Sequence, residues 1–307
     1  MGKMLTGGTA ECVPRKKRGK LAMKTGLVLE GGGMRGLFTA GILDVWMERG
    51  LTFDGAVGVS AGACFGCNYM SGQIGRGIRY NVKYAGDWHY KGFRSLLLTG
   101  DIFGADFCYR KLPTELDIFD EEAFAANPME FYAVATDAKK GIPVYKKLKD
   151  GGEADMLFVR ASASLPLVSR VVPYGKRGLL DGGITDSIPL KFMEGRGYER
   201  NVVVLTQPEG YVKEKTKLVP AAKVLLRKYP KMVDCMANRH IMYNNQTAYV
   251  QARKEQGKAF VIAPLEALHI ANLEAKEEEL RRVYDAGRAA AERSWDDLLA
   301  FLANGKE

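Results

Sequence analysis

Residues 25–62 read TGLVLEGGGMRGLFTAGILDVWMERGLTFDGAVGVSAG, and this stretch decides the fold. Residues 26–29 form a short apolar run that predicts a buried strand, which the glycines at 31–33 end. From residue 36 to 49, apolar side chains recur at helical spacing. Gly50 follows, a residue typical of the position just after a helix. The stretch therefore begins with a strand, a glycine loop and a helix.

A second strand and a second helix complete this unit. Residues 54–59 return to a strand pattern, and residues 61–71 predict the next helix. Consecutive strands joined through a helix run parallel and cross over with a right hand. The sequence therefore predicts an α/β protein with a mainly parallel sheet. Later segments fit the same class: strands at 130–136, 176–180 and 201–206, and a helix around 155–163.

Pattern and charge divide the chain into three regions. Residues 1–22 lack apolar periodicity, and we expect a basic, disordered leader there. Residues 23–210 hold the predicted strands and form the expected catalytic core. Residues 211–307 are mostly helical in pattern and are expected to form an extension packed on the core. Tyr80 to Asp120 is rich in aromatic residues with weak periodicity, and is interpreted either as a lid or acyl-binding wall or as a plain surface insertion.

The composition is that of a globular protein, since 47% of the 307 residues are hydrophobic and 26% are charged. No apolar run approaches the roughly 18 residues of a membrane-spanning helix. The net charge is +9, but residues 1–22 carry six basic residues and one acidic residue, so the remainder is only mildly basic. Nucleic acid is therefore not an expected partner. A second basic stretch, 213–231, fits a solvated face or a surface that meets anionic lipid headgroups.

The five cysteines are an odd number, and no secretory segment precedes the first strand. This usage is typical of the reducing cytoplasm, with at most peripheral contact with a membrane. Cys64 and Cys67 spell C-x-x-C, but no second cysteine pair or histidine pair accompanies them. We interpret both as small buried packing residues.

The pentapeptide GVSAG at 58–62 places a serine at a strand-to-helix junction. A nucleophilic serine needs a sharp turn that lifts its hydroxyl clear of the backbone. Small residues at Gly58 and Gly62 let the strand and the helix pass closely. Ser60 is therefore the candidate nucleophile.

The GGGMRG segment at 31–36 also follows a strand and opens a helix. Its backbone N–H groups converge in front of the positive end of that helix, an arrangement that holds an anion. In an acyl hydrolase the anion would be a tetrahedral oxyanion, and in a dinucleotide enzyme it would be a pyrophosphate.

The dinucleotide interpretation has a specific weakness. Gly31, Gly33 and Gly36 satisfy G-x-G-x-x-G, and Asp54 lies near the spacing of a ribose-binding acid. That acid belongs at the carboxyl end of the second strand, whereas Asp54 begins the strand. Ser60 stands at the carboxyl end instead, which favours acyl transfer.

A serine nucleophile also needs a base. In an α/β-hydrolase the catalytic acid precedes the catalytic histidine in the sequence, but His89 precedes every likely acid here. His240 and His269 lie in helix-like stretches. Asp181 ends an apolar strand and is followed by two glycines, and a partly desolvated carboxylate there would have a raised pKa. Asp-Gly-Gly is also an ordinary turn sequence, so the residues alone leave the role of Asp181 open.

Together these motifs resemble the patatin-like phospholipase family. The resemblance covers about residues 25–206. It is carried by the glycine loop 31–36, the elbow 58–62, the small-residue segment 161–166 (ASASLP) and the aspartate motif 181–183. One departure is Gly183, where many members have alanine.

The resemblance implies a three-layer α/β/α fold and a Ser60–Asp181 dyad. Ser60 would attack an ester carbonyl, Asp181 would take its proton and later activate water, and the oxyanion would be held by N–H groups of the loop. The residues implied are Ser60 and Asp181 as catalytic; Gly31, Gly32 and Gly33 as the oxyanion hole; and Arg35, Gly36, Gly58, Gly62, Gly182 and Gly183 as supporting.

The implied substrate is a lipid or another acyl ester, with no metal, cofactor or obligate protein partner. Arg35 would steady the loop or meet a phosphate, or would only form a salt bridge. Two other classes remain open: a nucleotide-binding oxidoreductase that uses the 31–36 loop, and a non-catalytic lipid-binding protein.

Overall fold

The computed structural model describes residues 23–303 and centres on an eight-stranded sheet. Five strands run parallel, in the spatial order β3-β2-β1-β7-β8. They are β1 (Lys24–Leu29), β2 (Gly55–Val59), β3 (Glu130–Asp137), β7 (Tyr198–Val204) and β8 (Ala259–Ile262). The antiparallel strands are β4 (Ile142–Leu148), β5 (Val172–Tyr174) and β6 (Arg177–Asp181).

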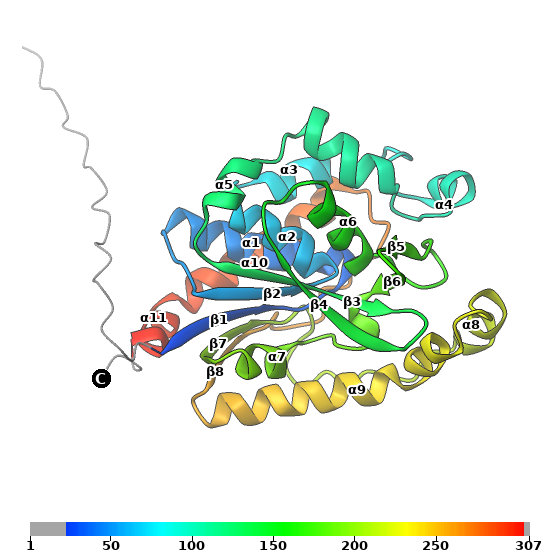
Figure 1. Cartoon of the computed structure of the whole chain (residues 1–307). Coiled ribbons are helices and arrows are strands. Elements are labelled where there is room, and N and C mark those ends of the chain that lie inside the picture. Colours follow the sequence, from blue (N-terminus) through cyan, green and yellow to red (C-terminus); the bar gives the residue numbers. More distant parts are fainter. Residues whose placement is uncertain (1–22, 304–307) are drawn as a thin grey trace, which may run out of the picture.

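Helices cover both faces of this sheet (Figure 1). One face carries α1 (Gly36–Glu48), α2 (Ala61–Met70), α6 (Glu153–Ser162) and α10 (Glu277–Arg293), and the other carries α7 (Leu190–Gly195) and α9 (Pro230–Glu255). The predicted three-layer α/β/α fold with a mainly parallel sheet is therefore confirmed. The other helices are α3 (Arg76–Lys83), α4 (Phe93–Thr99), α5 (Glu121–Ala126), α8 (Val219–Leu225) and α11 (Trp295–Ala303), with the short turns η1 (Gly33–Arg35) and η3 (Gly182–Ile184) and the π-helix η2 (Phe107–Leu116).

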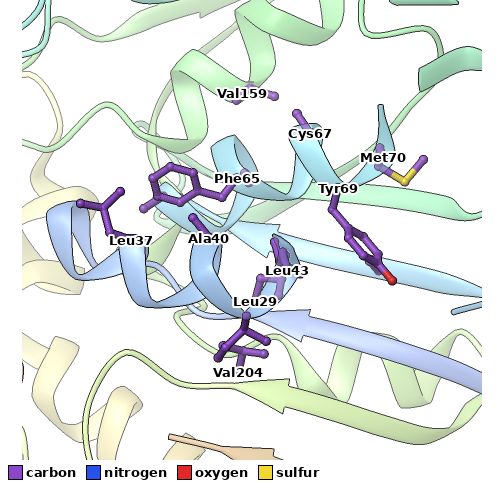
Figure 2. Packing of buried hydrophobic residues seen from close by; sticks show 14 of the residues in the cluster. Leu29, Leu37, Ala40, Leu43, Phe65, Cys67, Tyr69, Met70, Val159 and Val204 are labelled. Atoms are coloured by element: carbon purple, nitrogen blue, oxygen red, sulfur yellow. The ribbon is translucent and has the colours of Figure 1, made fainter. Parts of the chain in front are cut away.

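The core lies on both sides of β1 because successive side chains of a strand point to opposite faces. Leu27 and Leu29 join the large cluster beneath α1 and α2, whereas Val28 joins the cluster beneath α7 and α9. Figure 2 shows Leu29 beneath Leu43 of α1, with Phe65 of α2 packed on the same side. A strand buried on both faces requires the continuous apolar run seen at 26–29.

Two strands meet end to end along one edge of β3. β2 pairs with the first part of β3, and its last residue, Val59, lies opposite Val134. β6 runs the other way and pairs with the remainder, so that Asp181 lies opposite Ala135. The opposite edge of β3 is occupied along its length by β4. The ends of β2 and β6 therefore face each other across adjacent positions of β3.

Three strands were not anticipated from the sequence. β4 carries lysines and is largely half-exposed, and β5 has only three residues with a proline at its centre, so neither shows a clear apolar pattern. β8 is four residues long and pairs in parallel with β7. Residues after 211 thus contribute a strand to the sheet as well as helices. The expected leader, 1–22, lies outside the described residues.

Close packing of α10 on α1 predicts a strong effect of added volume at Gly287. A Cβ there would lie 2.0 Å from the carbonyl oxygen of Phe38 in α1, and the reciprocal Cβ at Gly41 would lie 2.1 Å from the carbonyl oxygen of Tyr284. Backbone atoms cannot move aside cheaply. We expect Gly287→Ala to lower the free energy of unfolding by about 1–3 kcal/mol, measured by urea denaturation. Gly195→Ala is the matched control, because nothing lies within 4 Å of its Cβ; equal effects of the two would contradict this account.

Candidate active site

Ser60 occupies a strained turn between β2 and α2. Its φ is 54° and its ψ is −122°, a conformation that residues other than glycine rarely adopt. The residue is 7% exposed, and its N–H donates to Oγ of Ser162 at 2.9 Å. Strain that the surrounding structure maintains is typical of a nucleophile elbow, in which the hydroxyl is held clear of the backbone.

Gly58 and Gly62 stand where β1, β2 and α2 approach one another too closely for a side chain, as their predicted supporting role requires. A Cβ at Gly62 would lie 2.4 Å from the carbonyl oxygen of Leu29, and a Cβ at Gly58 would lie 2.6 Å from the N atom of Ala63. Side chains at these two positions would push α2 away from β1 and β2. The elbow therefore depends on both glycines.

The glycine loop lies against the elbow. A Cβ at Gly31 would lie 2.9 Å from Cβ of Ser60. Within residues 23–303, the N–H groups of Gly31, Gly32 and Gly33 donate no hydrogen bond to the protein. The loop thus carries three free donors at the start of the η1 turn that leads into α1, and its first glycine, Gly31, lies against Ser60.

Arg35 and Gly36 support this loop from the other side. The guanidinium of Arg35 would come within 3.3 Å of a Cβ at Gly32, and its Nε is buried without a hydrogen bond to any described residue. A Cβ at Gly36 would lie 2.7 Å from Cβ of Ala61, directly after the elbow. The loop and the elbow are therefore packed as one unit.

Asp181 lies at the end of β6 and is 2% exposed. Its Oδ1 accepts a hydrogen bond of 2.7 Å from the N–H of Gly183. Burial raises the pKa of Asp181, and the side chain of Ser60, the positive charge of Arg239 and the N–H of Gly183 lower it in part. Oδ2 is also buried and makes no hydrogen bond of ordinary geometry within the described residues. Such a carboxylate is poised to accept a proton.

The segment 161–166 holds both residues in place. The hydroxyl of Ser162 accepts from the N–H of Ser60, and the carbonyl of Ser164 accepts from the N–H of Asp181 at 2.8 Å. Arg239 of α9 adds a further support, since its Nε donates to the carbonyl of Gly183 at 2.6 Å. Sequence reasoning noted the segment 161–166 without a role, and it missed Arg239 altogether.

Comparison with known proteins places this site in a family. The sequence profile described as "Patatin-like phospholipase" matches residues 27–193, more than half of the chain and all of the site described so far except Arg239. The chain belongs to the patatin-like phospholipase family. A second profile, described as a domain of unknown function (DUF6363), matches residues 229–303. Membership supports lipid hydrolysis as the class of function.

Several relatives of this patatin-like chain are known. The uncharacterized protein YjjU of Escherichia coli is 27% identical over 85% of the chain and 74% of its own length. Lysophospholipase nte1 of Aspergillus oryzae is 28% identical over 56% of the chain, and this match covers only 11% of the length of that protein. The crystal structure of VipD from Legionella pneumophila aligns with a TM-score of 0.43 and 12% sequence identity. The alignment covers 90% of the present chain and 67% of the VipD chain.

An apolar cavity of about 130 Å³ begins at Ser60 in this patatin-like protein. Its walls come from α2, η2 and α6, including Cys64, Leu112 and Val159. The segment 80–120 contributes a large part of the lining. It therefore forms a wall of the cavity and is not a plain surface insertion.

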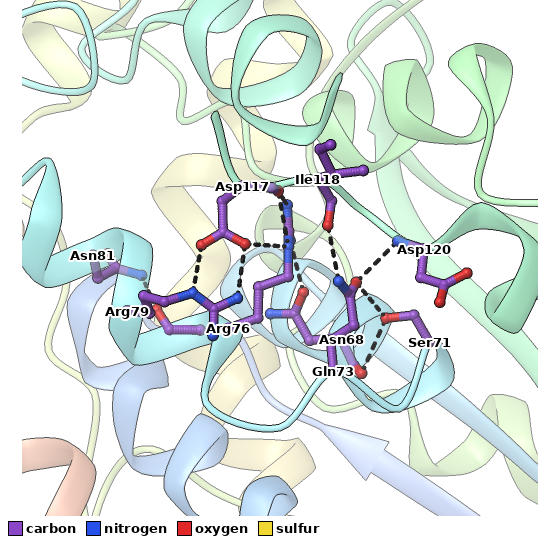
Figure 3. A network of polar contacts seen from close by, with 10 residues as sticks. Asn68, Ser71, Gln73, Arg76, Arg79, Asn81, Asp117, Ile118 and Asp120 are labelled. Carbon is purple, nitrogen blue, oxygen red and sulfur yellow. Dashed lines mark hydrogen bonds and ion pairs between the residues drawn. The ribbon is translucent and has the colours of Figure 1, made fainter. Parts of the chain in front are cut away.

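A polar network fixes that wall to the core (Figure 3). Buried Arg76 of α3 donates to the carbonyl of Asp117 at 2.6 Å, just after η2, and to Oδ1 of Asn68 in α2 at 2.8 Å. Gln73 donates to the carbonyl of Ile118 at 2.8 Å. These hydrogen bonds tie the segment just after η2 to α2 and α3.

The three histidines and Asp54 are not among the residues that line the cavity at Ser60. His240 is on α9 as expected, but His269 is in an irregular loop with φ 41°, so the helical interpretation of His269 was wrong. Asp54 accepts hydrogen bonds from Thr25 at the amino end of the sheet, opposite the glycine loop. This position agrees with the argument against a ribose-binding acid.

Cys64 and Cys67 are free thiols on α2. Burial raises the pKa of the Cys64 thiol to about 11, so the thiol stays protonated at neutral pH. Cys67 is buried in the apolar core, which confirms its interpretation as a packing residue, whereas Cys64 is half-buried against the core and also lines the cavity. No helix among residues 23–303 combines the length and apolar character that crossing a membrane requires.

Proposed function

We propose that this protein is a serine acyl hydrolase that cleaves lipid carboxylic esters through a Ser60–Asp181 dyad. The observation that carries the proposal is the meeting of β2 and β6 on one edge of β3, which sets a strained serine beside a buried carboxylate. Family membership and the lysophospholipase relative support a lipid as substrate.

The mechanism follows from the geometry of these groups. Asp181 accepts the Ser60 proton as the hydroxyl attacks the ester carbonyl, and the negative charge that develops on the carbonyl oxygen faces the free N–H groups of Gly31, Gly32 and Gly33. The alcohol leaves with the proton from Asp181, and the acyl group remains on Ser60. Asp181 then takes a proton from water, which attacks the acyl-enzyme; as the acid is released, Asp181 returns this proton to Oγ of Ser60.

A panel of esters tests the proposal and the cavity together. The cavity of about 130 Å³ is close in size to a roughly 150 Å³ protein cavity that holds benzene, so it accommodates about six carbons. We expect kcat/KM for p-nitrophenyl esters to rise from acetyl to about hexanoyl and then to level off or fall. A fluorophosphonate should label Ser60 with the same pH dependence. Absence of hydrolysis and labelling across the panel would contradict the proposal.

Cys64 lies in the wall of the cavity and offers a check on the chain-length argument. Cys64→Phe narrows the cavity next to Ser60. We expect this variant to lose hexanoyl hydrolysis while it retains acetyl hydrolysis. A change of equal size for both esters would show that the cavity does not hold the acyl chain.

Contact with an anionic bilayer is part of the same proposal. Large apolar side chains stand exposed on α4 and α8, which lie on the same side of the molecule in Figure 1. Basic side chains accompany them, and apolar anchors flanked by lysines suit anionic lipid headgroups. The apolar residues are Phe93 (76% exposed), Leu97 (84%), Val224 (71%) and Leu225 (65%), and the exposed lysines are Lys215, Lys217 and Lys223.

Vesicle binding measures this contact. We expect the protein to sediment with vesicles that contain phosphatidylserine, and Leu97→Asp to weaken that binding several-fold. Leu299→Asp is the control, since Leu299 is 41% exposed on α11 at the far side of the molecule. Equal binding of the wild type and Leu97→Asp would exclude α4 from the contact.

A further inference from the structure

A second cavity, of about 430 Å³, lies beside the cavity that contains Ser60. The two share Phe103 and Leu165 as walls. The second cavity also reaches the glycine loop, because Oδ1 of Asn272 in its lining would lie 2.5 Å from a Cβ at Gly33. A molecule bound at Ser60 therefore has two directions in which to extend.

The lining of this second cavity is polar on one side. Lys213, Arg239, His240 and Asn272 contribute there. Nδ1 of His240 is buried without a hydrogen-bond partner among residues 23–303. Most of the remaining lining is apolar, as in the first cavity, so the second cavity is distinguished by this group of cationic and hydrogen-bonding side chains.

Lys213 is held firmly in this position. Its backbone N–H donates to Oδ1 of Asn244 on α9 at 2.8 Å, and Nδ2 of Asn244 donates back to its carbonyl at 3.1 Å. Its ammonium lies 4.8 Å from the ring centre of Tyr243 and 5.7 Å from that of Tyr211. Within the described part of the chain it forms no salt bridge with a carboxylate.

The charges around Lys213 are unbalanced toward positive. Burial lowers the pKa of Lys213 to about 8, repulsion from Arg239 and Arg35 adds to this, and Glu30 offsets it in part. Glu30 is already engaged, since it accepts from the N–H of Thr206 at 2.6 Å and from Tyr243 at 2.7 Å. The acid in the cavity lining is the exposed Glu214. An anion in the cavity would relieve this repulsion.

We propose that the second cavity binds a phosphate group on the leaving alcohol of the ester, through Lys213 and Arg239 with Asn272 and His240 as further donors. This inference rests on the proposed function, because it places the acyl chain in the first cavity and the leaving alcohol in the second. Lys213, Arg239, His240 and Asn272 all lie outside residues 27–193, so this site belongs to the later part of the chain.

Two esters with the same acyl chain test the proposal: 1-hexanoylglycerol 3-phosphate and 1-hexanoylglycerol. We expect kcat/KM to favour the phosphorylated ester by about 100-fold, as two charge-assisted hydrogen bonds would provide. Lys213→Met should reduce this preference by about 10- to 100-fold, and Lys213→Arg should restore most of it. Lys258→Met, which removes an exposed charge at the amino end of β8, should leave the preference unchanged.

The possible failures are distinguishable. Hydrolysis of both esters without preference, or an equal loss for both in Lys213→Met, would overturn the phosphate site and leave the hydrolase intact. Hydrolysis of neither ester would count against the proposed function, and a binding experiment then decides whether the phosphate site exists.

In this binding experiment, glycerol 3-phosphate and inorganic phosphate are titrated into the Ser60→Ala protein, with and without Lys213→Met as a second change. Binding of glycerol 3-phosphate that weakens at least tenfold with Lys213→Met supports the site. No binding at 10 mM, roughly the weakest affinity of interest, or no effect of Lys213→Met overturns it. Binding of inorganic phosphate alone would overturn the assignment to a leaving alcohol.

Discussion

Ser60→Ala is expected to lower kcat/KM for ester hydrolysis by at least about 10⁴-fold, because it removes the atom that forms the acyl-enzyme. The glycine loop would remain, so weak turnover above the uncatalysed rate is compatible with the dyad. The variant should fold normally, since alanine retains the Cβ that packs against Gly31. Initial rates on hexanoyl esters measure the effect, and labelling by a fluorophosphonate should disappear.

A second change at the same residue separates chemistry from strain. Ser60→Gly also removes the hydroxyl, but glycine adopts φ 54° and ψ −122° with little cost. We expect it to be as inactive as Ser60→Ala and more stable than Ser60→Ala by about 1 kcal/mol. Activity retained in either variant would show that Ser60 is not the nucleophile.

Asp181→Asn is expected to lower kcat/KM by about 10³- to 10⁴-fold, since an amide cannot accept the serine proton. The side chain keeps its shape, and its oxygen can still accept from the N–H of Gly183. His240→Gln is the control, because His240 is the histidine in the neighbouring cavity. A collapse of turnover toward 1-hexanoylglycerol in folded His240→Gln, with Asp181→Asn active, would replace the dyad by a histidine mechanism.

The raised pKa of Asp181 adds a pH signature to this prediction. The active form is the carboxylate, so wild-type kcat/KM should fall as the pH is lowered through the raised pKa. The contribution of Asp181 to the free energy of unfolding should instead rise as the pH is lowered. Because the folded protein binds this proton more tightly than the unfolded chain, Asp181→Asn should be more stable than wild type above the raised pKa. That advantage should vanish as the pH falls toward 3.8, the ordinary value. Denaturation at several pH values measures it.

Much of the site could be predicted because its signals are local. Ser60 and the glycines at 58, 62 and 31–33 lie in one continuous stretch, where strand, loop and helix patterns are strong. Asp181 lies 121 positions later, and the residues alone could not separate a base from a turn. Its pairing with Ser60 depends on the antiparallel β6, whose register on β3 has no signature in a single segment.

Arg239 shows why other parts of the site could not be predicted. It is one basic residue on a long helix, and nothing near it in sequence distinguishes it from its neighbours. It contacts Gly183 only because α9 crosses beneath the carboxyl ends of the strands. The same applies to Lys213, which in sequence is one member of a basic stretch.

The sequence by itself determined the α/β class, the strand-elbow-helix unit and the place of the candidate nucleophile, because glycine spacing and apolar periodicity act over a few residues. Only the tertiary structure decided that β2 and β6 end against each other on β3, that the segment 80–120 walls the cavity at Ser60, and that a cavity with Lys213 and Arg239 in its lining adjoins it. These features arise from contacts between segments distant in the chain, which depend on packing and register and not on local preference.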